Sequence, residues 1–386
     1  MPEALLLFGD TERSPALRHE LPLAIMDELL FVDLGERVVV VTSDLERTRV
    51  ARARPDADVR LFEAFGWREL IDAGASWQEA TLETVARAAR ELGISEAVVP
   101  GDFPLSVADR LRGEGVHLRI DSAAVEARRR VKSGAELDGV RAAQRAAEAA
   151  MAAVAAMLTR AEPGDDGHIH LGGALLEAEH VRAALRETCA AHGAACPPDV
   201  MVSSVRSGFG HEPGSGPLPA GVPIEIDLWP RDEATGCWAD MTRTFIVGDP
   251  RPEHAEEIAK QERLVRTALE DARRAVRPGV TGRELHDATC DLFEAAGYRT
   301  QRTGPGEDPS EGFQFSLGHG VGLEVHEAPY LGRAGREPLV AGDVVAVEPG
   351  LWDRRIGGVR FEDLLLVTDD GCETLTRFPY NLEPSS

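Results

Sequence analysis

Hydrophobic and polar positions in the first third of the chain alternate in short runs of two different periods. β-branched and aromatic runs bounded by turn residues predict strands at residues 29–34, 37–42, 97–100 and 116–120. Apolar residues at helical spacing predict helices at residues 77–92 and 106–112. Strands that alternate with helices are typical of a small α/β domain, which we assign to residues 1–125.

The remainder, residues 126–386, repeats one pattern of elements twice. The first copy predicts a helix at 136–158, a Pro-Gly break, a helix at 173–192 and an apolar strand at 200–205. The second copy predicts a helix at 254–276, another Pro-Gly break, a helix at 283–296 and a strand at 312–317. Each copy then runs into strand patterns that we expect to pair antiparallel, 223–228 with 238–247 and 343–347 with 359–367.

Composition and charge narrow the class of protein. The 386 residues include 42 Lys and Arg against 66 Asp and Glu, which gives a formal net charge of −24. Such a surface repels phosphate backbones and anionic membranes, so we expect neither nucleic acid nor a membrane as a partner. The five cysteines are odd in number and lack C-x-x-C spacing, which argues against structural zinc and a disulfide framework. We therefore expect a cytoplasmic protein.

Acidic side chains beside apolar strand residues supply the candidate chemistry. Asp227 and Asp240 lie on the two runs of the first expected hairpin, Glu348 ends a later run, and Glu362 lies within the last one. His319 lies between these pairs, in a glycine-rich segment. Carboxylates are costly to bury unless they are paired, and hard divalent cations would neutralise them. An oxygen-rich ligand set with one imidazole and no thiolate suits Mn²⁺, and a metal pair roughly 3.5–4 Å apart is the arrangement of two-metal hydrolases.

From about residue 132 to the end, the chain resembles the prolidase and aminopeptidase P metallopeptidases, whose catalytic domain has the pita-bread fold. The matching stretches, in order, are Ile226-Asp227, Ala239-Asp240-Met241-Thr242-Arg243-Thr244, His319-Gly320-Val321-Gly322, Glu348-Pro349-Gly350 and Gly357-Gly358-Val359-Arg360-Phe361-Glu362-Asp363. The resemblance implies an α/β (α+β) protein. Its pita-bread catalytic domain would occupy residues 126–386, and a smaller creatinase/prolidase-like α/β lid domain would occupy residues 1–125.

The same resemblance implies a role for each site residue. Asp227 chelates one of two divalent ions, Asp240 and Glu362 bridge the pair, and His319 and Glu348 complete the other ion. Glu348 would also carry the proton. The ions implied are Mn²⁺, with Co²⁺ and Zn²⁺ as alternatives.

Three further residues match the family around this ligand set. His211 and His326 are expected to hydrogen-bond the substrate, and Arg360 to orient it. Two departures stand out. Asp227 and Asp240 are two residues farther apart than is usual, and the stretch before His211 lacks the frequent asparagine.

The function that follows is hydrolysis of the bond between an N-terminal residue and proline, by a homodimer that acts on small peptides with proline in second place. The substrate is either a dipeptide or a longer chain, and the short N-terminal domain favours the dipeptide. Two alternatives remain open: a creatinase-like hydrolase of the same fold that works without metal, and a pita-bread binding module without catalysis.

Overall fold

The computed structural model describes residues 3–205, 212–306 and 311–384. Internal contacts divide the chain into two compact units, Met1–Arg129 and Arg130–Ser386. The expected domain boundary between residues 125 and 126 lies inside helix α6 (Ser122–Arg130). Among the described residues, no helix combines the length and the apolarity needed to cross a membrane.

A six-stranded mixed sheet forms the centre of the first unit. In spatial order its strands are β4 (Asp58–Leu61), β3 (Val38–Thr42), β2 (Leu29–Asp33), β1 (Ala4–Gly9), β5 (Glu96–Val99) and β6 (His117–Ile120). The helical segments are α1 (Pro15–Glu20), α2 (Asp44–Ala53), η1 (Phe62–Phe65), α3 (Trp67–Asp72), α4 (Trp77–Glu91) and α5 (Leu105–Gly113). The four predicted strands and two predicted helices are all present.

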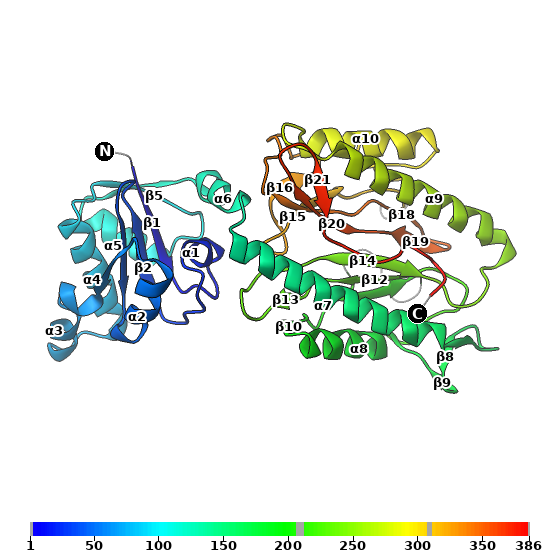
Figure 1. The fold of residues 1–386 in the computed structure, drawn as a ribbon, viewed down its shortest axis with the longest axis horizontal. Coiled ribbons are helices and arrows are strands. Elements are labelled where there is room, and N and C mark those ends of the chain that lie inside the picture. The colour runs from blue at the N-terminus through cyan, green and yellow to red at the C-terminus, as the bar shows by residue number, and fades with distance from the viewer. Residues whose placement is uncertain (1–2, 206–211, 307–310, 385–386) are drawn as a thin grey trace. The chain divides into compact units, whose positions relative to one another are not determined.

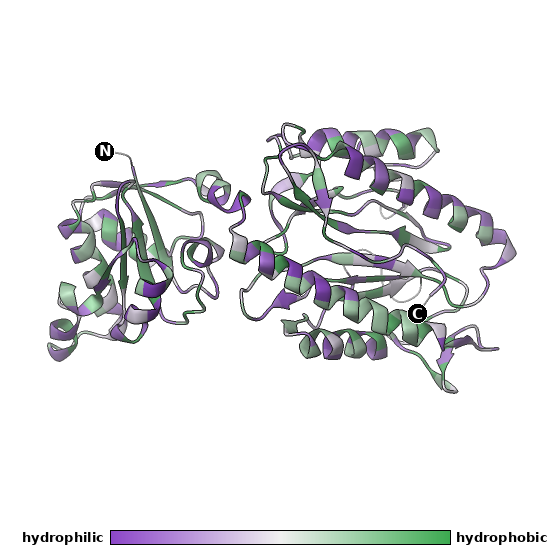
Figure 2. Ribbon diagram, in the orientation of Figure 1, coloured by the Kyte–Doolittle hydropathy of each residue, from purple (hydrophilic) through white to green (hydrophobic). Residues whose placement is uncertain are grey.

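Strand β1 escaped prediction because both faces of this sheet are covered. Leu6 packs on one face of the sheet, in a cluster with Val85 of α4. Leu7 packs on the other face, in a cluster with Leu17 of α1. A strand buried on both faces reads as a continuous apolar run and loses the alternation that marks a half-exposed strand. Figure 2 shows this concentration of apolar residues on the central strands.

Two pairs of helices flank the strands of the second unit. The pairs are α7 (Gly134–Thr159) with α8 (Ala178–Ala191), and α9 (Pro252–Ala275) with α10 (Gly282–Ala295). The strands β12, β14, β18, β19 and β20 lie between them (Figure 1). Both α7 and α10 begin with capping boxes, in which Ser133 and Thr281 each accept a backbone N–H three residues on. The four helices of the predicted repeat are confirmed.

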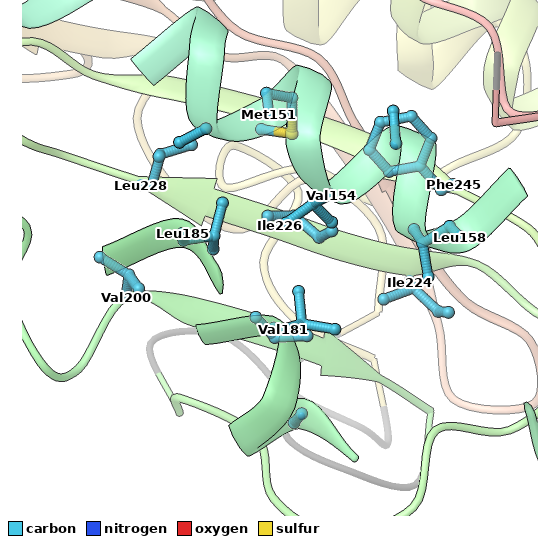
Figure 3. Close-up of a cluster of buried hydrophobic side chains, with 14 of the residues drawn as sticks. Met151, Val154, Leu158, Val181, Leu185, Val200, Ile224, Ile226, Leu228 and Phe245 are labelled. Atoms are coloured by element: carbon cyan, nitrogen blue, oxygen red, sulfur yellow. The ribbon is translucent and has the colours of Figure 1, made fainter. Parts of the chain in front are cut away.

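The first helix pair packs against a three-stranded antiparallel sheet. Its strands, in spatial order, are β11 (Met201–Ser204), β12 (Ile224–Leu228) and β14 (Met241–Phe245). Ile224, Ile226 and Leu228 point toward Met151 and Val154 of α7 (Figure 3). Because side chains alternate across a strand, the two acids between these apolar residues point away from the helices. This alternation aims the acids of β12 at the interior of the unit.

The second sheet has five strands. In spatial order they are β16 (Glu327–Leu331), β15 (Gly318–Gly320), β17 (Val344–Val347), β20 (Asp363–Val367) and β21 (Cys372–Thr374). A hairpin of β18 (Gly350–Asp353) and β19 (Gly357–Arg360) lies apart from this sheet. Two small sheets complete the described part of the unit: a pair of β10 (Ala194–Ala195) and β13 (Arg231–Asp232), and a three-stranded sheet of β7 (Glu162–Pro163), β8 (Ile169–Leu171) and β9 (Ala174–Leu175).

Two strand predictions for the second unit were wrong. Residues 312–317 form only isolated bridges at Gly312 and Phe313, and the strand begins later, at Gly318. Gly312 has φ +86° and approaches the Arg299 carbonyl so closely that a β-carbon would clash, which ends any regular strand there. The run 359–367 is divided between β19 and β20, which belong to different sheets, and Glu362 lies at the junction.

Candidate metal centre

The two aspartates reach the interior from neighbouring strands of the first sheet. Asp227 lies within β12, and Asp240 immediately precedes β14. The antiparallel register places Asp227 opposite Thr242, so Asp240 lies just beyond that pair. The apolar alternation of β12 buries Ile226 and Leu228 against α7, and that packing fixes the direction of the Asp227 carboxylate.

The other three predicted ligands come from the second sheet and its edge. His319 lies on β15, opposite Ala346 of β17. Glu348 follows the last residue of β17. Glu362 precedes β20, and its backbone N–H donates to the Thr242 carbonyl, 3.2 Å away, which ties the two sheets together.

These five side chains converge on one place. Three overlapping groups have ligand atoms within 4.8 Å of one another: Asp240 with His319 and His326; His319 with Glu348 and Glu362; and Asp227 with Asp240 and Glu362. His319 Nε2 lies 3.6 Å from Asp240 Oδ2 and 3.5 Å from Glu348 Oε1. Its Nδ1 lies 3.1 Å from the Gly320 carbonyl, to which a protonated Nδ1 donates, so that Nε2 keeps its lone pair.

Burial and mutual repulsion dominate the electrostatics of the group. Burial, reinforced by the neighbouring carboxylates, raises the pKa of Asp240 and of Glu362 well above the usual range. Burial also raises the pKa of Glu348 to about 7. For His319, burial lowers the pKa to about 3, so the imidazole is neutral at physiological pH. Clustered acids with raised pKa values and one neutral imidazole form an environment that divalent cations stabilise.

The donor set fits a metal pair. Within the described part of the chain, the buried Oδ1 of Asp227 and Oε1 of Glu362 have no hydrogen-bond partner. A buried polar atom without a partner is costly, and a cation would satisfy both oxygens. The other oxygen of Glu362 accepts from Thr242 Oγ1 at 2.7 Å, which fixes the orientation of the carboxylate.

One guanidinium lies among the carboxylates. Arg360, the last residue of β19, contacts Asp227 Oδ2 through Nη2 and lies 3.5 Å from Glu348 Oε2 through Nη1. Nη2 also lies 3.0 Å from Oε1 of Glu225. Although burial disfavours its charge, these carboxylates raise the pKa of Arg360 above its already high usual range.

Glu225 and Thr242 are not among the site residues predicted from the sequence. Glu225 is separated from Asp227 by one residue on a strand with clear alternation, and that spacing is the signal that both acids face the same side.

Of the two histidines predicted to contact substrate, His326 lies among the described residues. His326, between β15 and β16, is exposed, and its ring packs edge-on against His319 with 4.2 Å between centroids. It therefore lies at the solvent side of the ligand cluster. His211 falls outside the described residues.

The long connection between Asp227 and Asp240 forms a short strand and a turn. Arg231 and Asp232 form the short strand β13. Asp232 Oδ2 then accepts from Thr235 N at 2.8 Å and from Thr235 Oγ1 at 2.6 Å. Strand β12 still pairs with β14 in an unbroken register from Ile224 to Leu228. The extra residues thus leave the positions of Asp227 and Asp240 intact.

Fold and site together define a pita-bread protein with a carboxylate-rich candidate metal centre. The sequence profile of metallopeptidase family M24 matches residues 138–369. The chain belongs to this family.

Relatives match its sequence in part. It is 37% identical over 142 residues to an Xaa-Pro dipeptidase of Pyrococcus horikoshii, and this aligned region covers 36% of this chain and 35% of the relative. It is 34% identical over 147 residues to a probable dipeptidase PepE of Mycobacterium tuberculosis, and this aligned region covers 38% of this chain and 35% of the relative. The matched region thus spans about a third of each relative.

Solved structures match over nearly the full length. The prolidase of P. horikoshii superposes with a TM-score of 0.74 at 22% identity, over 98% of this chain and 95% of that chain. The Xaa-Pro dipeptidase of Bacillus anthracis superposes with a TM-score of 0.77 at 23% identity, over 99% of this chain and 94% of that chain. An X-Pro aminopeptidase of Thermotoga maritima superposes with a TM-score of 0.74 at 21% identity, over 98% of this chain and 96% of that chain. The fold predicted from the sequence is therefore confirmed.

Proposed function

We propose that this chain is a dinuclear-metal peptidase that hydrolyses the bond between an N-terminal residue and proline. The observation that carries the proposal is the convergence of four carboxylates and one neutral imidazole, with two buried carboxylate oxygens that have no hydrogen-bond partner in the described residues. Membership of a metallopeptidase family supports the chemistry. Relatives named Xaa-Pro dipeptidase support the substrate class.

The overlap of the three ligand groups supports an assignment of each ligand to one or both of the two ions. Asp240 and Glu362 both lie in the group of Asp227, and each also lies in a group of His319, as expected of carboxylates that bridge an ion near Asp227 and an ion near His319. We assign Asp227 to one ion, and His319 and Glu348 to the other. When bound, a pair of divalent ions supplies Lewis-acid activation of water and of the scissile carbonyl.

The residues around the ligands supply proton transfer and orientation. Glu348 is half-buried at the edge of the ligand group, and it is proposed to accept a proton from water and later to donate it, as the resemblance implies. The nitrogen of an Xaa-Pro bond, like that of any peptide bond, must receive a proton before it leaves as an amine. Glu348 is the proposed donor. The exposed ring of His326 is proposed to hydrogen-bond the substrate carbonyl, together with His211, while Arg360 orients the substrate.

Finer features of the proposal rest on the resemblance. Mn²⁺ is the proposed ion, with Co²⁺ and Zn²⁺ as alternatives, and the proposed assembly is a cytoplasmic homodimer. The first unit is proposed as the lid domain that limits substrate length. We accordingly favour dipeptides over longer peptides with proline in second place.

The test compares Ala-Pro with Ala-Pro-Ala as substrates, after exhaustive chelation and after reconstitution with Mn²⁺. The proposal expects cleavage only with metal, and faster cleavage of Ala-Pro. Activity that survives chelation would favour the creatinase-like hydrolase. Absence of cleavage of either peptide by protein with two bound ions would favour the binding module and defeat the peptidase proposal.

A further inference from the structure

A fifth acid, Glu225, lies beside the predicted ligands. It precedes Asp227 by two residues on β12, so both side chains point to the same side of the strand, away from α7. The side chain is 4% exposed. A carboxylate that is buried this deeply, at a position where an apolar residue would pack without cost, needs a compensating role.

Glu225 shares its partner with a predicted metal ligand. Arg360 Nη2 lies 3.0 Å from Glu225 Oε1, and the same nitrogen contacts Asp227 Oδ2. The second oxygen of Glu225 is buried and has no hydrogen-bond partner elsewhere in the described chain. The guanidinium therefore divides its hydrogen bonding between an acid outside the ligand set and one inside it.

The charges of the pocket show what the additional acid changes. If all five carboxylates are ionised when metal binds, they and one guanidinium carry a net charge of −4, which two divalent ions neutralise. The carboxylates are Glu225, Asp227, Asp240, Glu348 and Glu362. If position 225 were neutral, the net charge would be −3, and two divalent ions would leave an uncompensated positive charge in a buried site.

We infer that Glu225 is a positioning residue for the metal centre: it draws Arg360 partly away from Asp227 and supplies the charge that balances a second divalent ion. Without Glu225, the guanidinium is free to form a two-pronged pair with Asp227, and an incoming cation then has to compete with it. This inference rests on the proposed dinuclear centre and extends it to a residue outside the ligand set.

Loss of the Glu225 charge should act differently on the stability of the metal-free protein and on its affinity for metal. In metal-free protein, loss of the Glu225 charge relieves repulsion among the buried carboxylates, so thermal stability stays level or rises. Affinity for metal falls, because the pocket is less negative and Arg360 competes more strongly. A merely structural residue would lower stability and leave the intrinsic affinity of the folded protein unchanged.

The experiment titrates metal-free protein with Mn²⁺ by calorimetry at one fixed pH and records the thermal midpoint of the metal-free form. Glu225→Gln keeps the shape of the side chain and removes its charge. The matched control is Glu136→Gln, a change at a buried acid that caps α7 through Ser133. Glu225→Asp, which retains the charge, shows whether the charge or the exact side chain matters.

We expect Glu225→Gln to weaken Mn²⁺ binding about 10- to 100-fold, the range found when outer partners of metal ligands are changed, without lowering the metal-free midpoint. Glu136→Gln should keep the wild-type affinity, and Glu225→Asp should lose less affinity than Glu225→Gln.

Three results would overturn the inference while the wild type still binds two ions: unchanged affinity in Glu225→Gln, a midpoint that falls together with the affinity, or an equal loss in Glu225→Asp. A wild-type protein that binds no Mn²⁺ would overturn the proposed function as well.

Discussion

Arg243 of β14 is buried directly behind the candidate metal centre, and its replacement tests whether a single guanidinium holds that region together. Arg243 Nη2 lies 3.0 Å from Asp363 Oδ1, and the two side chains are 1% and 0% exposed. Its ring partner is Tyr380, 4.6 Å from the guanidinium carbon. The guanidinium also donates to four backbone carbonyls at 2.6–2.9 Å, those of Thr242, Glu362, Phe378 and Pro379.

Arg243→Met keeps an apolar stem of similar length and removes every one of these donors. Asp363 would then keep the hydroxyl of Tyr380, at 2.5 Å, and the more exposed guanidinium of Arg273, 3.9 Å away, while its own charge stays buried. Removal of one member of a buried ion pair costs about 3–5 kcal/mol, because the remaining charge is uncompensated. Since domains are stable by only about 5–15 kcal/mol, we expect a large part of the stability of the second unit to be lost.

Denaturant titration of the metal-free protein measures this loss. Trp229, Trp238 and Trp352 lie in the second unit and report its transition. The double variant Arg243→Met with Asp363→Asn should be less destabilised than the sum of the two single variants, because it leaves no buried charge unpaired. A loss below about 1 kcal/mol for Arg243→Met, or strict additivity in the cycle, would refute the reasoning.

Three further outcomes are expected. Glu362→Ala should halve or abolish metal binding, measured as bound Mn²⁺ per chain, and an unchanged stoichiometry would contradict its bridging role. His326→Ala should lower turnover of Ala-Pro while metal content stays nearly intact; loss of both together would mean that its role is misassigned. Burial raises the pKa of Cys237 from 9.0 to about 12, and burial next to Asp363 raises the pKa of Tyr380 from 10.0 to about 12. The native state therefore retains protons that the unfolded state releases, and stability should fall as pH rises from about 9 to about 12. Tyr380→Phe should flatten the thermal-midpoint profile in that range, and a wild-type profile that is already flat would exclude this linkage.

The local pattern of apolar and polar residues was sufficient to predict many of the strands, helices and candidate ligands of this protein. The alternation in Ile224-Glu225-Ile226-Asp227-Leu228 predicts a strand with two acids on one side, and the strand is present with its apolar residues against α7. Helices α7 to α10 were predicted from their spacing and from the Pro-Gly breaks between them. The order of the candidate ligands was also readable, because residue types and their short flanking motifs are properties of the chain itself.

Prediction failed where neighbours distant in sequence decide the outcome. The apolar run at Ala4–Gly9 becomes a central strand because helices cover both faces of its sheet. The run 359–367 is split because its two halves pair with different strands.

The sequence by itself thus determined the long helices and most of the strands, which side of β12 carries acids, and which side chains are candidates for metal binding. Only the tertiary structure decided that Arg360, 133 residues from Asp227, inserts between Asp227 and Glu225. It also decided that Arg243 ties Glu362 and Asp363 to residues 378 and 379. Local periodicity sets only the direction of a side chain relative to its own strand; the partner it meets depends on how whole sheets pack, which is set by the combined burial of many apolar residues.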